Sequence, residues 1–122
     1  MTRPLDQPPV VLLATAAVTG LLHWGIGWVA TPLAGVMTGL WTDRWHGLIG
    51  AAGVGGGWAG SVVYTAAVTP GAFRVLLDTL EGLAGPLPGE IFIALPVVLG
   101  SLLGGLGSGV GRCLRLLATA EG

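Results

Sequence analysis

Residues 45–73 read WHGLIGAAGVGGGWAGSVVYTAAVTPGAF, and this stretch decides the fold class. Its 29 residues contain no Asp, Glu, Lys or Arg, and eight of them are glycine. A helix of about 20 apolar residues crosses the roughly 30 Å hydrocarbon core of a bilayer. We therefore expect one membrane-spanning helix at about 47–68, which Pro70 ends.

The rest of the 122 residues is almost as poor in charge. Only 9% of the chain is charged, against roughly 25% in an ordinary soluble domain. Apolar residues make up 52%, glycine adds another 23 residues, and the formal net charge is −1. These values exclude the surface of a soluble enzyme, a basic nucleic-acid-binding protein and a disordered tail. The sequence predicts a single transmembrane domain, 1–122, in the cell membrane, with lipids as its first partners.

Two further windows, 7–42 and 91–111, also lack charged residues. The first is too long for one crossing, because 36 helical residues would extend about 54 Å. Pro8 and Pro9 favour a helix start, glycines near residue 26 loosen the backbone, and Thr31 and Pro32 resemble an N-cap and a first helical residue. We therefore expect spans at about 9–26, 31–42 and 90–111. The span at 31–42 is short, so a re-entrant half-helix is the alternative there.

Residues 70–84 show a different pattern. Leucines and Phe73 recur at helical spacing, whereas Arg74, Asp78 and Glu81 share the opposite face. Such a helix favours the membrane interface. The predicted fold class is an all-α integral membrane protein: a four-span helical bundle with a short second span and one interfacial amphipathic helix.

The five basic residues, all arginine, indicate the orientation. With four spans and a cytoplasmic N-terminus, Arg3, Arg44, Arg112 and Arg115 are cytoplasmic and only Arg74 is outside. This agrees with the positive-inside rule. Three spans would divide the arginines two against three. We therefore expect a multi-pass protein with both termini in the cytoplasm.

Glycines follow one face of several predicted spans. Small residues let membrane helices approach closely and gain van der Waals contacts, whereas burying leucine gives little because lipid is equally apolar. The stripes therefore predict helix packing, with the lining of a conduit as the alternative. The expected packing residues are Gly35, Gly39, Gly50, Gly53, Gly57, Gly60, Gly100, Gly104, Gly107 and Gly111.

One ionisable side chain within a span is a candidate functional group. His23 lies on the small-residue face of the first span, near its outer end, and Glu90 begins the fourth span on the same side. A buried ionisable residue in a membrane marks a functional site by default. His23 and Glu90 therefore form a candidate site for proton transfer or pH sensing. The alternative is that His23 is a neutral hydrogen-bonding residue or lies among the headgroups.

Other motifs carry no chemistry. Gly55–Gly60 matches the dinucleotide-binding pattern GxGxxG, but it lies inside an apolar span rather than between a strand and a helix. Cys113 is the single cysteine, so it forms no internal disulfide or CxxC metal motif. The six acidic residues are too scattered for paired-carboxylate catalysis. We expect no catalytic residues, no cofactor and no metal, and hence no enzyme.

The stretch from Pro32 through Gly35, Gly39 and Trp41, a charged turn, and then Gly47 to Gly53 carries a resemblance. It resembles small glycine-rich membrane proteins of haloarchaea and other prokaryotes, which are grouped as domains of unknown function. About 30 residues are covered. The resemblance implies a short proline-led helix, a polar turn and a second glycine-rich helix, and it implies no activity.

Two functions of different classes follow. The first is a non-catalytic structural or accessory subunit that is held together by glycine-rich helix packing. The second is a small oligomeric transporter or channel with a proton or pH-sensing site at His23 and Glu90. Besides lipids, we expect a homo-oligomer or a larger membrane complex, and no nucleic acid. The first function is favoured because polar rings, which usually line pores, are missing from the spans.

Overall fold

The computed structural model describes residues 7–122, and this part of the chain is helical apart from its turns. It contains five α-helices and one short 3₁₀ helix. Their bounds are α1 (Pro8–Gly25), η2 (Trp28–Ala30), α2 (Pro32–Trp41), α3 (His46–Val68), α4 (Pro70–Ala84) and α5 (Gly89–Ala120). The predicted all-helical class is confirmed. Helix α5 continues nine residues beyond the expected end of the fourth span at 111.

Prolines and glycines set most of the helix boundaries. Pro8, Pro32 and Pro70 are each the first residue of a helix, where the missing N–H costs nothing and the fixed φ suits the helix. Gly27, between α1 and η2, has a φ of 116°, and Gly85, after α4, has a φ of 73°. Both values lie in the region that favours glycine, so these two residues allow the chain to turn.

Close contacts between α1 and α3 give the relative direction of these two helices. A Cβ on Gly53 would lie 2.6 Å from Cγ2 of Thr15. One turn later, a Cβ on Gly57 would lie 2.7 Å from Cγ2 of Thr19. Because both positions advance together, α1 and α3 run in the same direction.

Helices α2 and α5 also run in the same direction. Gly35 of α2 packs directly against the backbone of Gly104. One turn later, Gly39 packs against the backbone of Ser108. Helix α2 follows α1 after the turn at Gly27 and runs opposite to it. His23 near the end of α1 and Thr31 at the start of α2 both contact Trp58, whereas Thr15 in the first half of α1 meets Thr38 near the end of α2. Both helices of this pair therefore run opposite to α1.

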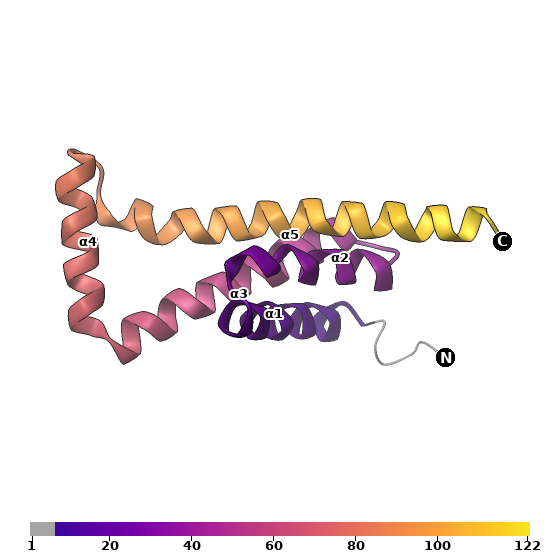
Figure 1. The fold of residues 1–122 in the computed structure, drawn as a ribbon, viewed down its shortest axis with the longest axis horizontal. Coiled ribbons are helices and arrows are strands. Elements are labelled where there is room, and N and C mark those ends of the chain that lie inside the picture. Colours follow the sequence, from indigo (N-terminus) through magenta and orange to yellow (C-terminus); the bar gives the residue numbers. More distant parts are fainter. Residues whose placement is uncertain (1–6) are drawn as a thin grey trace.

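Helix α3 meets α5 in the opposite sense. Gly50 contacts the carbonyl oxygen of Gly104. Gly55, further along α3, contacts the hydroxyl of Ser101, which comes earlier in α5. The order of directions along α1, α2, α3 and α5 is therefore up, down, up, down. Figure 1 shows that α1 begins and α5 ends at the same end of the molecule.

Helix α4 lies across the other end. The chain bends by 114° between α3 and α4, and α5 then returns along the whole length of the bundle (Figure 1). Thr15 of α1 faces Gly53 of α3. At about 1.5 Å per residue, α3 extends about 23 Å from Gly53 to Val68, whereas α1 extends only about 15 Å from Thr15 to Gly25. The hairpin of α1, η2 and α2 therefore ends before the level of α4.

The interior consists of small and hydroxyl-bearing residues rather than large apolar ones. The buried polar residues are Thr15, Thr19, Thr31, Thr38, Thr42 and Ser108. The buried apolar residues are Val11, Ala30, Ala34, Ile49 and Val54. In residues 7–122 no leucine is buried, and Leu21 and Leu106 are 74% and 70% exposed. A water-soluble core shows the opposite distribution.

Two helices are long and apolar enough to cross a membrane. These are α1 and α5, and α3 with α4 forms a third candidate if the bent pair counts as one span. Helix α2 has only ten residues, which is about 15 Å and half of a hydrocarbon core. Within the described part of the chain, the structure thus supports a helical protein with two to three candidate spans.

Candidate functional site

The glycine stripes form the main interfaces of the bundle. Eight of the ten glycines predicted to pack are buried against backbone or side-chain atoms of another helix: Gly35, Gly39, Gly50, Gly53, Gly100, Gly104, Gly107 and Gly111. A Cβ on Gly107 would lie 2.7 Å from the carbonyl oxygen of Pro32, which is closer than Cβ atoms approach. The α2–α5 and α3–α5 interfaces therefore depend on the missing side chains.

The other two predicted packing glycines behave differently. Gly57 is half-buried and contacts Thr19 of α1, as described above. Gly60 is exposed, and a Cβ there would meet no atom within 4 Å, so its predicted packing role is not seen in the single chain. Gly55, which the stripe of α3 does not include, is buried on the hydroxyl of Ser101.

Threonine hydroxyls supplement the glycine contacts. Most of them donate to the backbone carbonyl four residues earlier, as Thr19 does to Thr15 at 2.8 Å and Thr38 to Ala34 at 2.9 Å. The hydroxyls of Thr15 and Thr38 also lie 2.7 Å apart, which is an interhelical hydrogen bond between α1 and α2. The buried hydroxyls thus remain satisfied without water, as an apolar surrounding requires.

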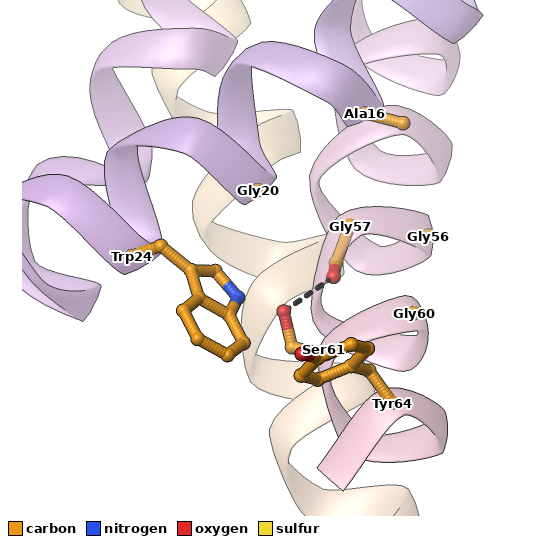
Figure 2. A pocket seen from close by; sticks show the side chains of 8 residues that line it. All are labelled: Ala16, Gly20, Trp24, Gly56, Gly57, Gly60, Ser61 and Tyr64. Atoms are coloured by element: carbon orange, nitrogen blue, oxygen red, sulfur yellow. Dashed lines mark hydrogen bonds between the residues drawn. The ribbon is translucent and has the colours of Figure 1, made fainter. Parts of the chain in front are cut away.

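An open groove runs between α1 and α3, and we call it the α1–α3 groove (Figure 2). It measures about 450 Å³ and is lined by Ala16, Gly20, Trp24, Gly56, Gly57, Gly60, Ser61 and Tyr64. Trp24 and Tyr64 close one end, with ring centroids 5.1 Å apart and planes at 82°. A Cβ on Gly20, Gly56 or Gly60 would meet nothing within 4 Å. Within residues 7–122, these glycines therefore serve no close contact.

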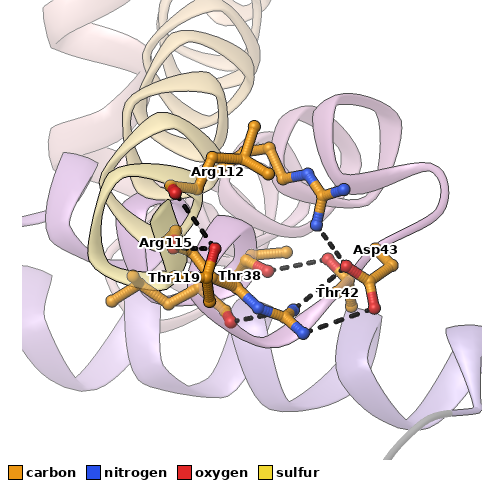
Figure 3. Close-up of polar contacts among 8 residues, drawn as sticks. Thr38, Thr42, Asp43, Arg112, Arg115 and Thr119 are labelled. Atoms are coloured by element: carbon orange, nitrogen blue, oxygen red, sulfur yellow. Dashed lines mark hydrogen bonds and ion pairs between the residues drawn. The ribbon is translucent and has the colours of Figure 1, made fainter. Parts of the chain in front are cut away.

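A cluster of charges joins the turn after α2 to α5 (Figure 3). We call it the Asp43 cluster, and it consists of Asp43, Arg112 and Arg115. The guanidinium of Arg112 donates to Oδ1 of Asp43, and Arg115 lies 3.2 Å from the same oxygen. Arg115 also reaches the carbonyl oxygen of Leu40 at 3.3 Å. The hydrogen bond from Arg112, together with the positive charges of both arginines, holds the pKa of Asp43 below its ordinary value of 3.8. The cluster fixes α5 to the α2–α3 turn.

His23 lies in the last turn of α1, and its side chain contacts α3. Its ring contacts the indole of Trp58 edge to face, with centroids 5.7 Å apart. Among the described residues, its buried Nδ1 has no hydrogen-bond partner. The Trp58 indole is itself held in place, since Nε1 donates to Oγ1 of Thr31 at 3.2 Å. A Cβ on Gly100 would lie 2.8 Å from Trp58 Cγ, so α5 also packs closely against the ring.

Glu90 lies apart from His23. It is exposed in the first turn of α5, and the ion pairs found in residues 7–122 all involve Asp43. The structure therefore does not pair the two residues of the predicted ionisable site. A different carboxylate holds the start of α5: the backbone N–H of Gly89 donates to Oε1 of Glu81 at 2.7 Å. This contact links α4 to α5 and satisfies a helix N–H that would otherwise lack a partner.

A second cavity, which we call the His23 pocket, lies beneath α4 and measures about 440 Å³. Five of the described helices contribute to it. Its lining consists of His23, Trp28, Trp58, Ser61, Val62, Thr65, Phe73, Leu76, Leu77, Leu80, Phe92, Ile93 and Pro96. The apolar side of the amphipathic helix α4 faces into this pocket. Glu90 is not among the lining residues.

In residues 7–122 no group of three or more His, Cys, Asp or Glu side chains is arranged to hold a metal ion. The exposed Cys113 and the half-buried His46 stand apart from both cavities. Comparison of the chain with known protein families, with curated proteins and with solved structures finds no match.

Proposed function

We propose that the chain is a four-span integral protein of the cell membrane that acts without catalysis, as a structural or accessory subunit. The observation that carries this proposal is the reversed distribution of side chains: threonine, serine and glycine inside, leucine outside. Lipid accepts exposed leucine without penalty, and small residues are what membrane helices use to associate. Water would penalise so large an apolar surface.

The alternating directions of the helices favour four crossings. Helices α1, α2, α3 and α5 run up, down, up and down, so η2 with α2 serves as the short second span. The Asp43 cluster then lies at one membrane face together with the start of α1 and the end of α5. Helix α4 lies at the other face, across the bundle axis, as an interfacial helix should. The cluster carries Arg112 and Arg115, which makes its face cytoplasmic.

Cysteine labelling in intact and permeabilised cells tests this orientation. In a Cys113→Ser background, we expect Asp78→Cys to react with a membrane-impermeant maleimide from outside. Arg44→Cys and Glu121→Cys should react only after permeabilisation. Labelling of Arg44→Cys and Asp78→Cys from the same side would contradict the four-span arrangement.

The α1–α3 groove supports the role as a subunit. Elsewhere in the bundle glycine is used where backbones touch, whereas Gly20, Gly56 and Gly60 face open space. Glycine within a helix costs about 1 kcal/mol relative to alanine. A helix from another subunit, seated against these glycines, would recover that cost through close packing.

Native mass spectrometry of the detergent-extracted protein tests this role. We expect the protein to carry another subunit, and Gly60→Leu to release it. Gly109→Leu is the matched control, because Gly109 also faces open space but lies on α5, away from the groove. A wild-type protein that is monomeric throughout would contradict the accessory role.

The unpartnered Nδ1 of His23 favours a second function, a small oligomeric transporter or channel with a pH-sensing site. Because Glu90 is exposed and makes no ion pair with His23, that site would depend on His23 more than on Glu90. A pH-dependent flux assay in vesicles should lose its response in His23→Ala and keep most of it in Glu90→Gln. Equal behaviour of wild type and His23→Ala would exclude this function, and a closed homo-oligomer would support it. The resemblance of residues 32–53 to glycine-rich prokaryotic membrane proteins stays a prediction.

A further inference from the structure

The His23 pocket has the size and the lining of a site for a small molecule. Its volume of about 440 Å³ lies within the range of about 300–1,000 Å³ that is usual for ligand pockets. Four aromatic side chains contribute to it: Trp28, Trp58, Phe73 and Phe92. They come from four different helices, η2, α3, α4 and α5. The pocket is therefore a feature of the tertiary fold rather than of one helix face.

One edge of the pocket is polar, and its groups are mainly acceptors. The hydroxyl of Ser61 donates to the carbonyl of Gly57 at 3.0 Å, and that of Thr65 donates to the carbonyl of Ser61 at 2.9 Å. Each hydroxyl has a single proton, so both oxygens retain only acceptor capacity. The Nδ1 of His23 is buried and has no partner among the described residues, whereas Nε2 is not buried in this way. In the neutral tautomer that is protonated at Nδ1, Nε2 is a further acceptor at the pocket.

The lining carries no permanent charge. All of its residues lie in the described part of the chain, and none is Asp, Glu, Lys or Arg. An ionised headgroup in such a place would lose its hydration without gaining a counter-charge, which costs several kcal/mol. The pocket therefore discriminates against carboxylates and phosphates and accepts a neutral molecule.

The position of the pocket indicates how such a molecule arrives. The α1–η2–α2 hairpin ends about 8 Å before the level of α4, by the helical rise from the facing pair Thr15 and Gly53. The pocket occupies the space between this end and α4, and Leu76 on its α4 wall is half exposed. In the proposed orientation that space opens sideways to the outer leaflet. A ligand that is dissolved in the bilayer can reach it without passing through water.

We propose that the His23 pocket binds a neutral amphiphile of the membrane, with an apolar chain or ring system that ends in a hydroxyl group. The apolar part contacts the aromatic and leucine walls. The hydroxyl donates its one proton to an acceptor of this edge, Nε2 of His23 or Oγ1 of Thr65. This site is independent of the accessory role, because residues of one chain line it and it needs no second subunit.

Tryptophan quenching tests the proposal in detergent micelles. Replacing Trp24, Trp41 and Trp45 by Phe leaves Trp28 and Trp58, which both line the pocket. The probes are a brominated long-chain alcohol, the brominated alkane of the same length and the corresponding brominated fatty acid at neutral pH. We expect saturable quenching by the alcohol, and apparent affinities for the alkane and the ionised acid that are weaker by on the order of tenfold.

Matched variants locate the binding. Val62→Phe, which fills the pocket, should abolish saturable quenching, whereas Val63→Phe at the neighbouring exposed position should leave it unchanged. His23→Phe should remove the preference for the alcohol over the alkane, and His46→Phe should retain it. Thr65→Val, which keeps the side-chain shape, should weaken that preference without altering the circular dichroism spectrum.

Three results would overturn the proposal. Equal quenching by alcohol and alkane in wild type would show only the annular lipid environment. An unchanged preference for the alcohol in both His23→Phe and Thr65→Val would remove the acceptor edge from recognition. Tighter binding of the fatty acid than of the alcohol would contradict the neutral ligand.

Discussion

Gly50 of α3 and Gly104 of α5 meet so closely that a Cβ on Gly50 would lie 2.6 Å from the carbonyl oxygen of Gly104. The neighbouring contact is equally tight, since a Cβ on Gly104 would lie 2.7 Å from Cβ of Val54. Two backbones at this distance gain van der Waals contacts along the whole crossing, which is the main source of association between helices in lipid.

Gly104→Ala should therefore destabilise the bundle, although alanine is the better helix former. The new methyl group would overlap the backbone of Gly50 and the side chain of Val54, and overpacking costs typically about 1–3 kcal/mol. Gly109→Ala on the same helix faces open space and should stabilise by up to about 1 kcal/mol through helix propensity. Unfolding of both variants in mixed micelles, followed by circular dichroism, gives the comparison. Equal stabilisation by both substitutions would contradict the contact.

The hydrogen bond between Thr15 and Thr38 should give a measurable coupling between α1 and α2. Membrane interhelical hydrogen bonds average about 0.6 kcal/mol and reach about 1.7 kcal/mol. A double-mutant cycle with Thr15→Val and Thr38→Val should give a coupling free energy in this range. A cycle that pairs Thr15→Val with Thr79→Val is the control, since Thr79 is exposed on α4 and donates only within its own helix. A coupling of zero in the first cycle would mean that the two hydroxyls act independently.

The Asp43 cluster should make the attachment of α5 sensitive to acid. Because the pKa of Asp43 in the folded protein lies below 3.8, the cluster stabilises the fold at pH values above 3.8 and loses this effect as the pH falls through the lowered pKa. Carboxyl NMR titration should show the lowered pKa in wild type and its return toward 3.8 in Arg112→Gln. Arg74→Gln, on the distant helix α4, should leave the titration of Asp43 unchanged. A wild-type value at or above 3.8 would contradict the contact with Arg112.

Gly100→Ala should displace Trp58. The indole cannot move away from a methyl group on α5 without changing its 3.2 Å hydrogen bond to Thr31 or its contact with His23. In a protein whose other tryptophans are replaced by Phe, the emission of Trp58 should shift. Gly105→Ala is the matched control, because its methyl group would meet Ala51 at an ordinary 3.6 Å. The same emission spectrum in both variants would show that Gly100 does not hold the indole.

The sequence predicts the helices well because their boundaries are local. Pro32 and Pro70 begin helices for covalent reasons, and Gly85 ends α4 through its own backbone freedom. The end of α5 was harder to predict: the arginine at 112 marks the end of an apolar window, but it is a good helix former and α5 continues to Ala120. The change in charge marks an expected membrane boundary, and the helix does not stop there.

The sites depend on tertiary contacts, and the sequence predicts them less completely. The helical spacing of the glycines identified Gly104 and Gly107 as contact residues, but it also included Gly60 and omitted Gly55. The width of a contact face depends on where the neighbouring helices lie, and the sequence of one helix does not contain this information. The pairing of Asp43 with Arg112 joins residues 69 positions apart, and no local pattern contains it. For His23 the sequence indicated an unusual residue, whereas its neighbour is Trp58 rather than Glu90.

The reversed interior also determines which substitutions this protein can tolerate over evolutionary time. In a water-soluble domain, leucines are constrained and surface positions drift. Here the leucines face outward, so Leu106 can exchange with any apolar residue of similar hydropathy, whereas Gly107 beside it can exchange with almost none. Related chains should therefore keep their glycines and threonines in register while their apolar residues diverge. Evolutionary relationship among such proteins should therefore be recognised from the spacing of their glycines and threonines.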